Sequence, residues 1–140
     1  MLRLLQVAAL LLAGCATLRL YPGEPRDSSR IACLRPAIMP ARLILIDAVD
    51  DLALGWLQDR VELPPGEHTA RVTVILRGRE RQTQFTHSLR FRAEPGRNYI
   101  VYAEPDLYGP RTFILDDQMG SVVAEATSRA RRGQRGPLEP

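Results

Sequence analysis

The sequence predicts one small antiparallel β-sandwich, and three observations support that fold class. The chain has 140 residues, of which 45% are hydrophobic and 25% are charged, a composition typical of a soluble globular protein with one domain. Short segments with apolar residues at every second position recur along the chain, as expected of half-buried strands. Turn signals made of Pro, Gly and Asp separate these segments at intervals of roughly ten residues. No pattern of alternating strands and helices is present, so an all-β architecture is expected.

Residues 1–14 predict a lipoprotein signal peptide. Arg3 gives a positively charged start, and residues 4–12 form a mostly apolar stretch that is short for a membrane span. The stretch closes on four residues that resemble a bacterial lipobox: Leu12, Ala13, Gly14 and Cys15. The resemblance implies that the chain is cut before Cys15 and that lipid is attached to the Cys15 thiol. An ordinary signal peptide with an incidental cysteine is the alternative.

Residues 15–29 are predicted to be the lipidated cysteine and a tether. Pro22, Gly23 and Pro25 interrupt any regular pattern in this segment. A flexible chain of this length spans on the order of 20 Å. In lipoproteins of many Gram-negative bacteria, Asp after the cysteine retains the protein in the inner membrane. Ala16 stands there instead, so the resemblance implies an outer-membrane anchor with the domain facing the periplasm.

Residues 30–126 are predicted to form the sandwich, and a hairpin is its clearest part. Apolar residues alternate with polar ones over both 70–77 and 85–92, and polar residues 78–81 connect the two segments. The pair therefore predicts a hairpin with one buried face and one solvated, arginine-rich face. The uninterrupted apolar run Leu43–Ile46, flanked by charge, predicts a buried strand over 42–47.

Five further strands are predicted, at 31–34, 56–63, 98–103, 111–115 and 121–124. Pro65-Gly66 and Pro95-Gly96 have the chemistry of type II turns, in which glycine takes a positive φ. For the last strand the alternative is a short helix, capped by Asp117 and running to about residue 130. Cys33 has no disulfide partner if Cys15 carries lipid, so it is expected to be a small buried side chain, the alternative being a reactive thiol.

The charge is distributed unevenly along the chain. All 19 basic residues are arginines, and residues 30–125 hold 12 arginines against 13 acidic residues. Residues 127–140 hold four arginines against one glutamate and have no apolar periodicity, so they are predicted to be a disordered basic tail. Because the predicted domain is nearly neutral, the sequence argues against a nucleic-acid partner.

The turn residues carry a resemblance to a known family. The segment 61–72 (VELPPGEHTARV) ends one strand in a Pro-Gly turn and resumes as an alternating strand, and 91–99 (FRAEPGRNY) has the same layout. With Leu45-Ile46-Asp47 before them, these segments resemble PEGA-type domains, which small bacterial lipoproteins often carry. The resemblance covers 42–103 and departs from the family pattern at 47–55, where a longer acidic stretch replaces a compact turn. It implies a transthyretin-like or immunoglobulin-like sandwich used for binding or spacing, and it brings no catalytic residues.

The residues that are able to carry chemistry are few. His68 follows a turn and is expected to be solvated, whereas His87 lies on the apolar face of its strand and is expected to be a hydrogen-bonded core residue. Aspartates cluster at 47–51 and 116–117, but their spacing lacks the glycine and alternating ligands of an EF-hand, so no metal site is predicted and calcium is the alternative. No nucleophile elbow or phosphate-binding glycine loop occurs, and no cofactor is predicted.

The remaining candidate is a binding face on the predicted hairpin. Arginine suits two-pronged contacts with carboxylate and phosphate, so this face is able to meet an anionic envelope glycan or an envelope protein. A solvated face without a ligand is the alternative. Tyr108, in an expected loop, is added as an interface residue. The arginines are Arg71, Arg77, Arg79, Arg81, Arg90 and Arg92.

These features predict a membrane-anchored periplasmic lipoprotein that acts as a non-catalytic binding or scaffolding module. The membrane is its first partner, through the lipid on Cys15. Two alternatives stay open: an accessory lipoprotein of a secretion or envelope machine, and a glycan-acting or metal-dependent enzyme.

Overall fold

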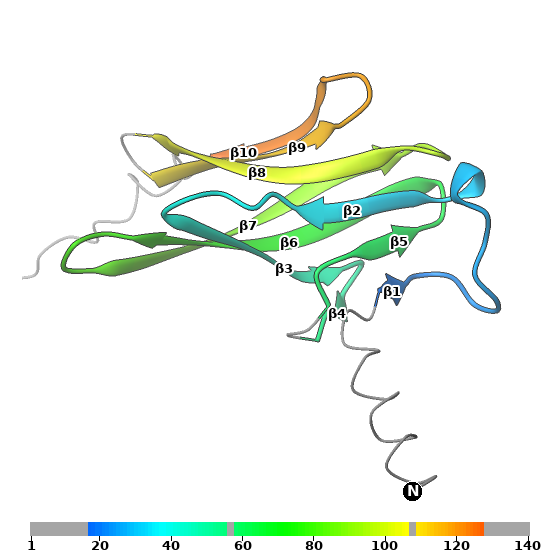
Figure 1. The fold of residues 1–140 in the computed structure, drawn as a ribbon, viewed down its shortest axis with the longest axis horizontal. Helices are drawn as coiled ribbons and strands as arrows, with labels where there is room; N and C mark the ends of the chain where they lie inside the picture. The colour runs from blue at the N-terminus through cyan, green and yellow to red at the C-terminus, as the bar shows by residue number, and fades with distance from the viewer. Residues whose placement is uncertain (1–16, 56–57, 107–108, 128–140) are drawn as a thin grey trace, which may run out of the picture.

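The computed structural model describes residues 17–55, 58–106 and 109–127, and they form two sheets that face each other (Figure 1). The predicted all-β sandwich is confirmed. One sheet has the strand order β1-β5-β2-β8-β9-β10 and the other has β4-β3-β6-β7. The six-stranded sheet contains β1 (Leu18–Arg19), β2 (Ala32–Pro36), β5 (Val61–Leu63), β8 (Asn98–Asp106), β9 (Gly109–Asp116) and β10 (Val122–Thr127). The four-stranded sheet contains β3 (Arg42–Val49), β4 (Leu52–Ala53), β6 (Gly66–Arg77) and β7 (Gln82–Ala93).

The β6–β7 hairpin is the longest paired unit of the fold. Its register runs without a break from Gly66 opposite Ala93 to Arg77 opposite Gln82, and the Gly78 amide donates to the Arg81 carbonyl oxygen across the connection at 2.9 Å. This register confirms the predicted hairpin. The period of two in the sequence fixes which of its side chains face the core.

The core lies between the sheets and is built from the inward faces of both. Phe91 of β7 and Tyr99 of β8 meet edge to face, with ring centroids 5.3 Å apart. Leu34, Leu63 and Ile114 are fully buried around them. Full burial of each such side chain contributes roughly 1.5–3 kcal/mol, so this contact between sheets is the main source of stability.

Two strand pairs are parallel, which the prediction of an antiparallel sandwich did not include. β2 runs parallel to β8, and β1 runs parallel to β5. Parallel neighbours need a connection longer than a hairpin turn. The chain between β2 and β8 provides this long connection, because it forms the whole four-stranded sheet. The same connection includes β5, which pairs with β2 in the six-stranded sheet.

Other elements differ from their predictions in extent or type. The strand predicted over 56–63 is limited to β5, with 56 and 57 outside the described residues. The last segment is strand β10, paired with β9, so the alternative of a helix after Asp117 is wrong over the described part. Pairing with β9 partly buries Ala124 and Ala126 against the core, and this outweighs the local capping signal. The two turn glycines, Gly66 and Gly96, have φ values of 131° and 76°, as predicted.

The predicted tether is partly bound to the domain. The Leu18 amide donates to the Arg60 carbonyl oxygen and the Leu20 amide to that of Glu62, each at 3.0 Å. The Tyr21 side chain is only 7% exposed, and its hydroxyl donates to Glu62 Oε2 at 2.5 Å. A single 3-10 turn, η1 (Ser28–Arg30), precedes β2. The Pro and Gly residues of this segment correctly predicted an irregular backbone. They did not predict that the segment packs against a sheet, which an irregular backbone is able to do.

Candidate functional site

The predicted arginine face divides into two groups. Arg71, Arg90 and Arg92 are exposed on the outward face of one half of the hairpin, as the register places them. Arg77 and the connection with Arg79 and Arg81 lie at its far end. Because a strand rises about 3.3 Å per residue, Arg77 lies roughly 20 Å along β6 from Arg71. The structure thus separates arginines that the sequence grouped on one face.

The two groups also differ in their ion pairs. Glu67 lies 3.4 Å from Arg90 Nε and 4.0 Å from Arg92 Nη1, so one carboxylate partly neutralises both side chains. Among the described residues, no carboxylate forms an ion pair with Arg77, Arg79 or Arg81. Arg71 likewise forms no ion pair with a described carboxylate, but the hairpin end gathers three such exposed arginines. That end is therefore able to bind an anionic group without breaking an existing pair.

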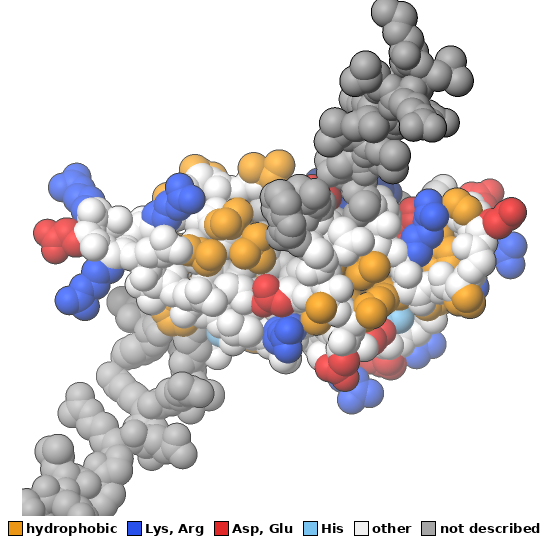
Figure 2. All heavy atoms as spheres, turned by 90° about the horizontal axis from the view of Figure 1, so that it is seen from below, with side chains coloured by type: hydrophobic (Ala, Val, Ile, Leu, Met, Phe, Trp, Pro, Cys, Tyr) orange, Lys and Arg blue, Asp and Glu red, His pale blue; other side chains and the backbone are white. Residues whose placement is uncertain are grey.

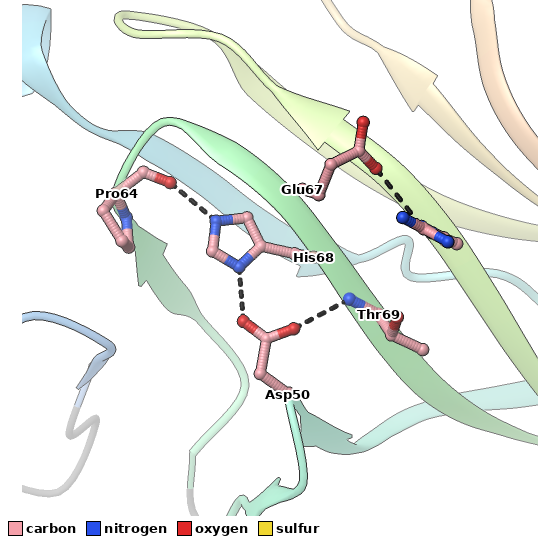
Figure 3. Close-up of polar contacts among 6 residues, drawn as sticks. Asp50, Pro64, Glu67, His68 and Thr69 are labelled. Atoms are coloured by element: carbon pink, nitrogen blue, oxygen red, sulfur yellow. Dashed lines mark hydrogen bonds and ion pairs between the residues drawn. The ribbon is translucent and has the colours of Figure 1, made fainter.

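His68 is buried at a polar junction, so the prediction that it is solvated is wrong. Its Nδ1 lies 2.5 Å from Asp50 Oδ2, its Nε2 lies 2.6 Å from the Pro64 carbonyl oxygen, and the ring is 7% exposed (Figure 3). A carbonyl oxygen only accepts hydrogen bonds, so Nε2 carries a proton. Nδ1 faces the Asp50 carboxylate, so both ring nitrogens have a polar partner. The junction joins the turn after β3, the turn before β6 and β6 itself.

The clustered aspartates have separate structural partners. Asp50, at a φ of 49°, also accepts the Thr69 amide through Oδ1 at 2.8 Å. Asp47 accepts the Thr73 hydroxyl, and Asp116 accepts the amides of the two residues at 118 and 119. No group of three or more His, Cys, Asp or Glu side chains is arranged to hold a metal ion within the ranges that the structure describes.

His87 and Cys33 are both held by polar contacts inside the fold. His87 Nδ1 lies 2.9 Å from the Thr112 hydroxyl, which confirms that this histidine is hydrogen-bonded, and burial lowers its pKa. Cys33 is buried in β2, and Arg60 Nε donates to its sulfur at 2.9 Å. Burial raises the pKa of the thiol, against the lowering effect of Arg60. The prediction of a buried cysteine is confirmed.

An apolar groove along β3 was not predicted. β4 pairs with only Ala48 and Val49, and no described strand pairs with 43–46 on that edge. The groove is lined by residues 36–39, by residues 42–47 and by Leu54, Gly55, Gln58 and Asp59. Its volume is about 470 Å³, within the usual range for ligand sites. The sequence signal that we missed is the uncharged stretch Pro36–Ala41, which begins at the last residue of β2.

The strand beside the groove is buried on one face only. Ile44 and Ile46 face the core, but Leu43 and Leu45 are 44% and 40% exposed, so the run predicted as a buried strand is half exposed. The reason is that no third layer covers the outward face of the four-stranded sheet among the described residues. Ile38, in the connection between β2 and β3, is fully exposed at 102%.

Several predicted residues lie outside the described ranges: the lipobox residues 12–15, Tyr108 and the tail from 128 onward. The described residues contain no helix that is long and apolar enough to cross a membrane. No protein-family profile, no curated protein and no solved structure matches the chain.

Proposed function

We propose that the protein is a lipid-anchored binding module of the bacterial envelope, held at the periplasmic face of the outer membrane. The observation that carries this proposal is the sequence Leu12-Ala13-Gly14-Cys15 at the end of a charged and then apolar N-terminus. Several acyl chains on Cys15 would give durable attachment, because each buried CH₂ contributes about 0.8 kcal/mol. The proposed role is non-catalytic, and it needs no cofactor.

The contact surface that we assign to this role is the end of the β6–β7 hairpin. Arg77, Arg79 and Arg81 are exposed there, and they form no ion pair with a described carboxylate. Guanidinium groups bind carboxylate and phosphate through paired hydrogen bonds. Carboxylate and phosphate are the anionic groups of peptidoglycan and lipopolysaccharide. The proposed partner is therefore an anionic envelope glycan.

Lipidation is tested with a matched pair of cysteine variants. The full-length chain is produced in a Gram-negative host that is fed a radioactive fatty acid, as wild type, Cys15→Ser and Cys33→Ser. We expect label in wild type and in Cys33→Ser, and none in Cys15→Ser, which should also stay uncleaved. Label retained in Cys15→Ser would refute the anchor.

Glycan binding is tested with two double variants that each remove two positive charges. Arg79→Gln with Arg81→Gln changes the hairpin end, and Arg90→Gln with Arg92→Gln changes the group that shares Glu67. Binding of the lipoprotein to isolated peptidoglycan sacculi and to lipopolysaccharide is measured by co-sedimentation. The first variant should lose most of the binding and the second should keep most of it; an equal loss in both would mean that net charge alone drives adsorption.

A further inference from the structure

The described chain is bound to the domain from its first strand onward. β1 pairs with β5 through Leu18 opposite Val61, and the buried Tyr21 ring closes the contact with Glu62. The chain therefore does not become free of the domain at residue 29, where the predicted tether ends. It is held from Leu18.

This pairing limits how far the domain is able to lie from the proposed anchor. Cys15 precedes Leu18 by three residues, and an extended chain covers at most about 3.6 Å per residue, or about 11 Å in all. A free tether up to residue 29 would allow on the order of 20 Å even as a flexible coil. A bilayer that holds the lipid on Cys15 is thus within about 11 Å of β1.

The apolar groove lies on the side of the domain where the described chain begins. Asp59 lines the groove, and the next residue, Arg60, is the one whose carbonyl oxygen binds Leu18. Figure 1 shows β1, β3 and β4 along the same lower side of the sandwich. Figure 2, which views that side directly, shows hydrophobic side chains gathered on it. The exposed members beside the groove include Ile38, Leu43 and Leu45.

We propose that this groove face, defined by Ile38, Leu43 and Leu45, rests on the bilayer to which Cys15 is attached. The proposal rests on the proposed lipidation. Exposed aliphatic side chains gain free energy by entering the boundary between headgroups and acyl chains. The partner is a lipid surface rather than a strand from another protein, because the short link keeps this face beside the bilayer.

The depth of contact follows from the polar groups on the same face. The groove-side edge of β3 at 43–46 has no described strand partner, and Asp59 is an exposed carboxylate. Unpaired backbone groups and carboxylates need water or headgroup partners and are not tolerated in hydrocarbon. The face therefore lies at the level of the headgroups, with Ile38 as the most deeply inserted side chain because it is fully exposed at a loop.

The test uses single fluorophores on the full-length lipoprotein in vesicles of phosphatidylethanolamine and phosphatidylglycerol. Ile38→Cys and Leu45→Cys place an environment-sensitive label on the groove face. Met119→Cys is the matched control, because Met119 is also apolar and 66% exposed, in the turn between β9 and β10 on the opposite side in Figure 1. Wild type measures background labelling of the buried Cys33. Mass spectrometry first establishes whether Cys15 carries lipid.

On lipidated protein, we expect iodide in the water to quench the labels at 38 and 45 several-fold less than the label at 119. Spin-labelled lipids should quench the first two several-fold more than the third. Equal quenching by iodide at all three positions would overturn the proposal while leaving lipidation intact. Protection from iodide without quenching by lipid would also overturn it, and would assign the face to a second copy of the chain. Absence of lipid on Cys15 would instead remove the proposed function, and this inference with it.

Discussion

Replacing His68 with alanine removes two hydrogen bonds from the junction between the β3–β4 turn and the start of β6. The contact with Asp50 is made to a carboxylate, and hydrogen bonds to charged groups contribute about 1.5–3 kcal/mol, whereas the bond to the Pro64 carbonyl contributes about 0.5–1.5 kcal/mol. Asp50 is 42% exposed, so water replaces part of what its carboxylate loses. We expect a loss of about 2–3 kcal/mol, which for a domain of this size lowers Tm by roughly 10–20 °C.

The assay is urea unfolding followed by circular dichroism, on wild type, His68→Ala, Asp50→Ala and the double variant. Because the two side chains contact each other, the double variant should lose at least about 1 kcal/mol less than the sum of the single variants. Glu67→Gln is the neighbouring control, since its ion pairs are exposed, and it should change stability by less than about 0.5 kcal/mol. A loss below about 1 kcal/mol in His68→Ala, or additive losses, would show that the junction does not support the fold.

Three further predictions concern the contacts that hold the fold. Burial lowers the pKa of His87 in the folded protein, so as the pH falls the unfolded chain takes up a proton at this residue before the folded protein does. The free energy of unfolding should therefore decrease as the pH drops below about 6.5. His87→Gln should flatten that decrease in urea unfolding measured from pH 5 to 8. Cys33 is buried with a raised thiol pKa, so it should react with a thiol reagent far more slowly in the native protein than in urea, and an equal rate would contradict its placement. Tyr21→Phe removes the hydrogen bond to the β5 carboxylate and should speed amide hydrogen exchange at Leu18 and Leu20 by about tenfold or more, with little change in β6.

The hairpin was predictable because its signal is local. Over 70–77 and 85–92 the period of two fixes which side chains are buried, and the polar connection at 78–81 fixes where the chain reverses. The positive φ of Gly66 and Gly96 followed from turn chemistry in the same way. These elements need no information from distant parts of the chain.

Elements that depend on a distant partner were not predictable. β1 has two residues and becomes a strand only because β5 offers it a parallel neighbour. His68 is buried because the β3–β4 turn brings Asp50 to it, eighteen residues away in sequence. Local patterns near Leu18 and His68 carry no trace of those partners, so the first was predicted to lie in a tether and the second in solvent.

The groove was missed because one sequence pattern is compatible with two structures. A continuous apolar run such as Leu43–Ile46 suits a strand covered on both faces, and it equally suits an outer strand whose second face is an interaction surface. The structure selects the second, because β4 is too short to cover β3 and no described layer covers Leu43 and Leu45. An exposed apolar face of this kind reduces solubility unless something contacts it. Its position beside β1, three residues from Cys15, supplies that contact without a separate partner, because the proposed anchor itself brings the bilayer to the face.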